Sequence, residues 1–216
     1  MFNYKTMILM RTCLPGQYNP TRISYQWAEA VKKDFEANGW QVLDLAVDDA
    51  VRSNAEKLLQ NSESIVFLFY GHGRSDQMLG QDKVALIDLT NLNLLKNRKA
   101  YIVACKTAKV LGRAAENISR FYLGYKECIR VYLLQPYAAC LGNCINKGIL
   151  AMLNTPDRTI EQARQFIVDE YNHWIDYYSV GAGAFDYFST SFAAALRYNR
   201  DSLAQVFGDR VATLTN

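Results

Sequence analysis

The chain has 216 residues, of which half are hydrophobic and 12% are aromatic. This length and composition suffice for a large folded core and exclude a chain that is disordered over most of its length. The formal net charge is only +3, and the Lys and Arg residues are spread along the sequence. The sequence therefore gives no basis for a nucleic-acid-binding surface.

The N-terminal stretch and the cysteines bear on the cellular compartment. The first residues contain only four consecutive apolar side chains, Met7 to Met10, too few for a signal-peptide core or a membrane span. The five cysteines are an odd number and have no framework spacing. We therefore expect a cytoplasmic protein with reduced thiols and no membrane association.

Strand and helix patterns alternate along the first two thirds of the chain. Apolar runs predict buried strands over 6–11, 40–46, 64–70, 100–104 and 128–134. Amphipathic patterns predict helices over 24–38, with Ser24 as N-cap, over 48–60 and over 109–122. Two apolar clusters around the turn Gly80-Gln81-Asp82 predict a small hairpin between the third and fourth strands.

From residue 138 onward the pattern is mainly helical, over 139–153, 159–177 and 191–206. The spacing of Glu161 from Thr159 does not fit a capping box. No linker rich in Pro, Gly or Ser divides the chain. The order predicts an α/β fold in one domain over 1–216, with a mostly parallel sheet covered by helices on both faces. An α/β core over 1–135 would carry the site, and 136–216 would be its mainly helical remainder.

Two of the predicted strands end at reactive side chains. FLFYGHGRSD places His72 just after the third strand, and KAYIVACKTAK places Cys105 just after the fourth. In an open parallel sheet, functional groups gather at the carboxyl ends of the strands. If these two strands are neighbours, an imidazole and a thiol lie within reach of each other.

A Cys/His pair of this kind is suited to acyl transfer. The thiolate is the attacking form of cysteine, and both the positive charge of Lys106 and the start of a following helix would favour it. His72 would act as general base or acid, and the backbone N–H groups of Gly73 and Cys105 would hold the oxyanion. The alternative from the residues alone is a buried core cysteine and a histidine in a turn.

The stretch from Ser64 to Leu111 resembles the caspase-fold cysteine peptidases, above all their CHAT branch. The shared features are a hydrophobic strand ending in His-Gly (IVFLFYGHG), a short hairpin and a hydrophobic strand ending in Ala-Cys (AYIVACKTA). The overall order of elements extends the resemblance to about residue 175. It implies a caspase-like three-layer sandwich and an endopeptidase with Cys105 as nucleophile. It also implies control by a partner protein in a bacterial antiviral defence or cell-death system.

The chain departs from the family at two places. Val103 and Thr107 stand where a caspase has the Gln and Gly of Gln-Ala-Cys-x-Gly. The stretch from Phe121 onward lacks the Trp-Pro that many CHAT domains carry after the fifth strand. These departures argue against a true caspase and leave the shape of the substrate cleft open.

The residue that sets the cleavage site is not fixed by the sequence. Arg11 and Arg22 could select an acidic substrate residue, and Asp186, Asp44 or Asp48 a basic one. Each could equally be a solvated surface charge. We expect no metal or other cofactor: Cys140 and Cys144 share one helical face, but a closed zinc site needs four ligands, and only Cys13, Cys128 and His173 remain to complete one.

Two other functions stay open. One is a catalytically silent caspase-like scaffold that binds a partner through its tyrosine-rich segment, 171–198. The other is a small-molecule hydrolase or nucleotide binder on a flavodoxin-like sheet. Gly181-Ala-Gly183 gives the latter little support, because the third glycine of a nucleotide fingerprint is missing.

Overall fold

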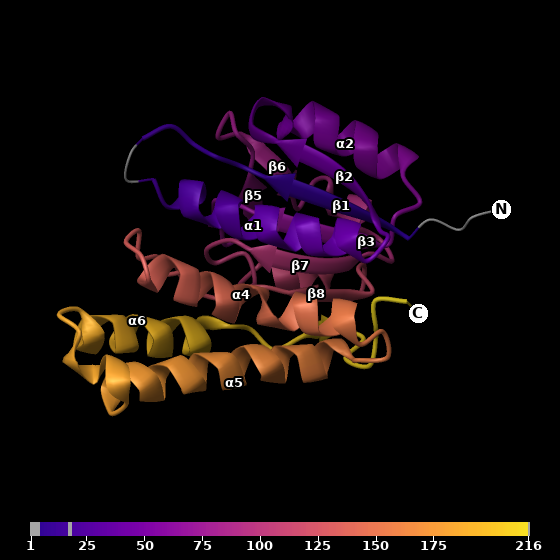
Figure 1. Cartoon of the computed structure of the whole chain (residues 1–216). Coiled ribbons are helices and arrows are strands. Elements are labelled where there is room, and N and C mark those ends of the chain that lie inside the picture. The colour runs from indigo at the N-terminus through magenta and orange to yellow at the C-terminus, as the bar shows by residue number, and fades with distance from the viewer. Residues whose placement is uncertain (1–4, 17–18, 216) are drawn as a thin grey trace.

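A computed structural model describes residues 5–16 and 19–215. Its centre is a six-stranded sheet with the strand order β2-β1-β3-β7-β8-β9 (Figure 1). The first five are parallel and β9 is antiparallel to β8. The strands are β1 (Thr6–Arg11), β2 (Gln41–Ala46), β3 (Val66–Tyr70), β7 (Lys99–Val103), β8 (Phe121–Leu123) and β9 (Phe207–Gly208).

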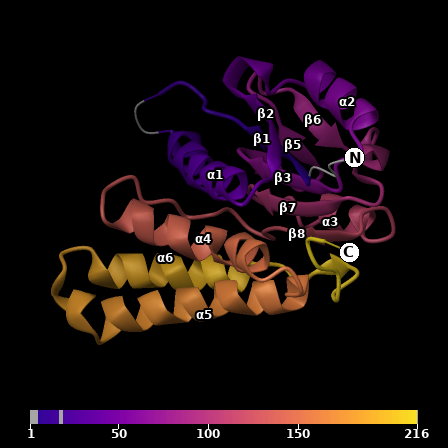
Figure 2. The same ribbon diagram turned by 45° about the vertical axis from the view of Figure 1, so that its right-hand side comes forward.

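Helices cover both faces of this sheet, as predicted for a three-layer α/β fold (Figures 1 and 2). One face packs on α1 (Pro20–Ala37) and α4 (Tyr137–Asn154), with α5 (Ile160–Ser179) and α6 (Ser189–Ser202) completing that side. The other face packs on α2 (Arg52–Asn61) and α3 (Leu111–Ala115). Among the described helices, none combines the length and apolar character needed to cross a bilayer.

A small antiparallel sheet lies between β3 and β7 in the chain. It consists of β4 (Gly73–Arg74), β5 (Gln77–Leu79) and β6 (Ala85–Asp88), and its buried side chains join the core of the α2 face. The hairpin predicted around residues 80–82 is therefore confirmed, with one further short strand before it. Three 3-10 turns, η1 (Val47–Asp49), η2 (Leu92–Leu95) and η3 (Ala182–Phe185), complete the fold.

The predicted fifth strand over 128–134 is wrong. Those residues form no strand, and the sheet continues instead with β8, which lies partly inside the helix predicted over 109–122. That helix is only the short α3. Side chains bind the backbone of 128–134 in place of a neighbouring strand: Asn199 bonds both the N–H and the carbonyl of Arg130.

The starts of the first two predicted helices and the cap of the fifth also differ from the structure. The first helix begins at Pro20, after Asn19, whose side chain accepts the N–H of Thr21, and Ser24 lies inside the helix. The second begins only at Arg52, because η1 occupies the preceding residues. Thr159 does form a capping box, with Gln162 rather than Glu161 as its partner.

Candidate active site

The carboxyl ends of β3 and β7 are neighbours at one edge of the sheet. The last register pair is Tyr70 with Val103, and the N–H of Gly71 continues the pairing with a 3.1 Å bond to the Val103 carbonyl. His72 and Cys105 each lie two residues beyond that pair. The two strands therefore bring the backbones of His72 and Cys105 to the same level of the same sheet edge.

The loops that follow the two strands are in direct contact at Gly73. A Cβ atom on Gly73 would lie 2.4 Å from Cγ2 of Thr107 and 2.8 Å from the carbonyl oxygen of Cys105. Only a residue without a side chain fits this approach. The glycine after His72 therefore allows the His72 loop to pack against the turn that begins at Cys105.

Cys105 is half-buried beneath the segment 127–129. The N–H of Ile129 donates to the Cys105 Sγ at 3.3 Å, and the N–H of Lys106 donates to the Glu127 carbonyl at 3.2 Å. Lys106 has a φ of +63°, so the chain turns sharply just after the thiol. Access to the thiol therefore depends on where this segment lies.

The thiol of Cys105 is protonated at neutral pH in this arrangement. Burial and, to a smaller extent, the neighbouring Cys128 thiol raise its pKa to about 11, although the Ile129 N–H and the charge of Lys106 act to lower it. The expected helix N-terminus gives no support, because α3 begins only at Leu111. That part of the expectation for the thiolate is wrong.

His72 is half-buried and uncharged at neutral pH. Burial lowers its pKa, and the positive charge of Lys83 lowers it further. Within the described residues no hydrogen bond to the imidazole ring is found, while the His72 carbonyl accepts the N–H of Leu79 at 2.9 Å. A neutral imidazole has the charge state that a general base needs.

The backbone around Gly73 leaves its N–H pointing away from β5. Leu79 bonds to the His72 carbonyl, and hydrogen-bonded pairs alternate along an antiparallel ladder, so Gly73 and Met78 form a non-hydrogen-bonded pair. The N–H of Gly73 is therefore not used by its neighbouring strand. This is compatible with the predicted oxyanion contact, which stays a prediction.

Arg11 has a different environment from the one expected of a residue that selects substrate. Its side chain is 3% exposed, forms ion pairs with Glu29 at 2.6 Å and Asp44 at 2.7 Å, and stacks on Tyr25. Asp44 is further paired with Lys32. The charges of Arg11 and Asp44 are thus already neutralised inside the fold, and both residues hold β1, β2 and α1 together.

The remaining residues considered for specificity lie on the surface. Arg22 is exposed on α1, and Asp186 is exposed after η3. Asp48 lines a cleft of about 440 Å³ together with Cys13, Pro15, Val51, Gln81 and Asp82. Their roles in substrate selection stay predictions.

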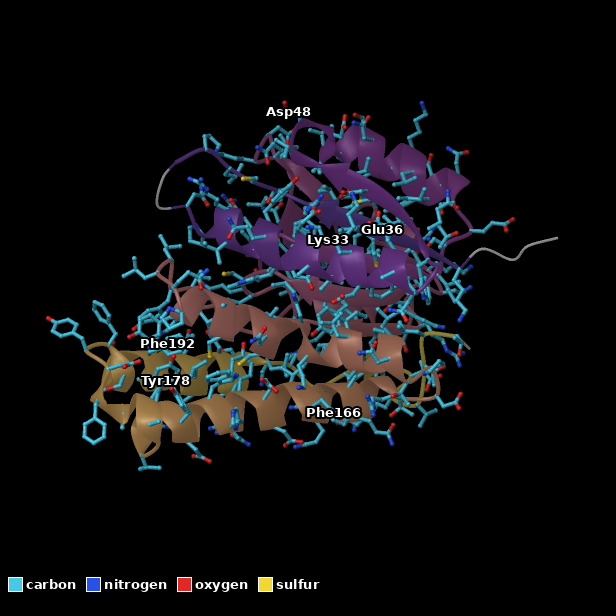
Figure 3. The ribbon with its side chains drawn as sticks, viewed as in Figure 1. Lys33, Glu36, Asp48, Phe166, Tyr178 and Phe192 are labelled. Atoms are coloured by element: carbon cyan, nitrogen blue, oxygen red, sulfur yellow. The ribbon has the colours of Figure 1, made fainter. Side chains whose placement is uncertain are left out.

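The tyrosine-rich C-terminal segment is divided between core and surface. Tyr178 packs edge-on against Phe192 with ring centroids 4.9 Å apart, at one end of the helical layer (Figure 3). Beyond it, the connection between α5 and α6 exposes Val180, Phe185 and Tyr187, at 84%, 95% and 93%. We call these three residues the apolar tip. Cys140 and Cys144, in contrast, are buried core residues of α4.

Comparison with known proteins identifies the fold. No family model and no curated protein sequence matches the chain. Among solved structures, the Arg-specific cysteine proteinase gingipain R matches with a TM-score of 0.59 and 10% identity, over 97% of this chain and 47% of that one. A pro-caspase-1 structure matches with a TM-score of 0.52 and 11% identity, over 82% and 83%.

The chain spans about half the length of the gingipain structure that it matches. At this level of identity the similarity concerns the fold. The chain has a caspase-like fold, with a mostly parallel sheet between helical layers, as its sequence motifs predict.

Proposed function

We propose that this protein is a cysteine endopeptidase that cleaves a protein substrate, with Cys105 as nucleophile and His72 as general base and acid. The observation that carries the proposal is the register of β3 and β7, which brings both residues to one level of the sheet edge in a caspase-like fold. The structural neighbours are cysteine proteases, so peptidase chemistry is the activity that this fold supports best.

The reaction would follow the general course of acyl transfer to a thiol. His72 takes the proton of Cys105, and the sulfur attacks the scissile carbonyl carbon to form a C–S bond. The N–H groups of Gly73 and Cys105 stabilise the oxyanion. The imidazolium then gives its proton to the leaving amine, and water activated by His72 hydrolyses the acyl-enzyme.

The resting state in the structure is one of low reactivity. Cys105 is protonated, half-buried and covered by 127–129, and His72 is neutral. We propose that a regulatory partner protein shifts this segment and so exposes the thiol. The apolar tip is a candidate site for such a partner, because large exposed apolar side chains on one connection are typical of interaction sites. Because the His-Gly and Ala-Cys motifs resemble those of CHAT domains, we also propose that the protein acts in the cytoplasm, in bacterial antiviral defence or cell death.

The test is labelling of the thiol by a mixture of peptidyl acyloxymethyl ketones, mapped by mass spectrometry. We expect adducts at Cys105 in preference to the other four cysteines. His72→Ala should lower the labelling rate by about 10² or more, the usual contribution of a general base. His173→Ala, which changes the exposed histidine on α5, is the matched control and should label like the wild type.

The alternative is a catalytically silent caspase-like scaffold. One observation favours it, namely that burial raises the pKa of the Cys105 thiol to about 11. A scaffold would show equal labelling of Cys105 in the wild type and in His72→Ala. That result would overturn the peptidase proposal.

A further inference from the structure

Two thiols meet at the candidate active site. Cys128 is exposed, and its thiol interacts with the thiol of Cys105. The residues on either side of Cys128 are both bonded to the turn at Cys105: the Glu127 carbonyl accepts the N–H of Lys106, and the Ile129 N–H donates to the Cys105 Sγ. Cys128 is thus held against Cys105 from both sides.

The segment that carries Cys128 is also fixed on its other side. Asn199 of α6 is fully buried and bonds both the N–H of Arg130, at 2.8 Å, and its carbonyl, at 2.9 Å. The N–H of Lys126 donates to the Ser202 carbonyl at 2.7 Å. Since both ends of 126–130 are anchored, the two thiols are kept together by the fold.

Proximity of this kind is what a disulfide requires. A disulfide forms only where the two backbones approach closely and the side chains face each other. Of the other cysteines, Cys140 and Cys144 are buried in α4, and Cys13 lies in the loop after β1. Cys128 is the one exposed cysteine, and among the cysteines it is the one whose thiol influences that of the candidate nucleophile.

We propose that Cys128 is a peroxide-reactive cysteine with Cys105 as its resolving thiol, so that a peroxide joins the two in a reversible disulfide. The peroxide oxidises the exposed Cys128 thiol to a sulfenic acid and leaves as water. The sulfur of Cys105 then attacks the sulfur of Cys128, the S–S bond forms, and the sulfenic oxygen leaves with the thiol proton as a second water. A dithiol reductant restores both thiols.

The consequence for activity rests on the proposed function, whereas formation of the disulfide does not. In the disulfide, the sulfur of Cys105 can no longer attack a carbonyl carbon. The same bond protects Cys105 from irreversible oxidation to the sulfinic and sulfonic acids. The peptidase would therefore be stored in an inactive form that reduction releases.

The test treats the full chain with hydrogen peroxide, blocks the remaining thiols with iodoacetamide and maps disulfides by mass spectrometry without reduction. We expect a Cys105–Cys128 cross-linked peptide that disappears on addition of dithiothreitol. Cys128→Ser should abolish it, and Cys13→Ser should leave its yield unchanged. Cys128 is exposed, so this substitution does not disturb the core.

Two results would overturn the inference. One is oxidation of Cys105 to the sulfinic acid in the wild type with no cross-link to Cys128. The other is a cross-link from Cys105 to Cys13 in similar yield. The two proposals can also fail separately. If the cross-link forms but the reduced chain is not labelled at Cys105 by the ketone probe, the disulfide is supported and the peptidase is rejected.

Discussion

The backbone N–H of Ile129 points at the sulfur of Cys105, 3.3 Å away, and the segment that carries Ile129 lies over the thiol. A substrate carbonyl has to reach the same sulfur. On the proposed function, attack on a peptide bond therefore depends on where this segment lies, and the reactivity of Cys105 reports its position.

We predict that Cys105 is a slow thiol in the isolated protein. Its pKa of about 11 leaves little thiolate at neutral pH, so the rate of alkylation by iodoacetamide should rise about tenfold per pH unit between pH 7 and 10. Towards this small reagent, which unlike the peptidyl ketones needs no peptide recognition, the exposed Cys128 should react first at pH 7.5. Peptide mapping of wild type and Cys128→Ser gives both rates. A rate for Cys105 that levels off below pH 9 would contradict the buried, protonated state.

We predict that Arg11 contributes to the stability of the fold and that Arg22 does not. Arg11→Met leaves the carboxylates of Glu29 and Asp44 without their guanidinium, and breaking a buried pair costs about 3 to 5 kcal/mol. The remaining Asp44–Lys32 pair limits the loss. Arg22→Met, at an exposed position of α1, should change the free energy of unfolding by less than about 0.5 kcal/mol. Urea denaturation of both variants measures this, and equal effects would refute the distinction.

The buried Lys99, at the start of β7, should make the free energy of unfolding depend on pH. Its side chain is 2% exposed, its Nζ has no hydrogen-bond partner in the described structure, and burial with the charge of Arg120 lowers its pKa to about 8. An unfolded lysine titrates near 10.4, so between about pH 8 and 10.4 the unfolded chain binds more protons. Stability due to Lys99 therefore rises with pH across this window.

Lys99→Met should remove this dependence. At pH 7 the variant should be about 1 to 3 kcal/mol more stable than wild type, because a buried unpaired charge is replaced by an apolar side chain. The difference should shrink at pH 9.5. Urea denaturation at both pH values measures it, with Lys33→Met on the exposed surface of α1 as control. A difference that is the same at both pH values would show that Lys99 does not titrate as described.

The sequence predicts the parts of the fold that depend on local pattern. Strands β1, β3 and β7 are built on continuous apolar runs, and the positions of His72 and Cys105 follow from where the last two of those runs end. Strand β8 is missed because its three residues give too short a pattern, while CIRVYLL over 128–134 has the pattern of a strand without a neighbour to pair with.

The rest depends on contacts between distant residues. Nothing near Arg11 in sequence shows that Asp44 and Glu29 neutralise it, and nothing near Cys105 shows that Cys128 and Ile129 cover it. Such contacts follow from how loops return to the sheet edge. The capping box at Thr159 is different, since Gln162 at the third following position is readable from the sequence.

The ion pairs of Arg11 also affect how the molecule meets other copies of itself. Strand β2 is one edge of the sheet, and an edge of six residues offers free backbone groups to a strand of another chain. Its Asp44 is an inward-pointing charge held by Arg11 and Lys32, which is one of the devices by which native edge strands resist strand addition. The opposite edge, β9, has only two residues. Charge at one edge and shortness at the other thus make both poor templates for aggregation through strand addition.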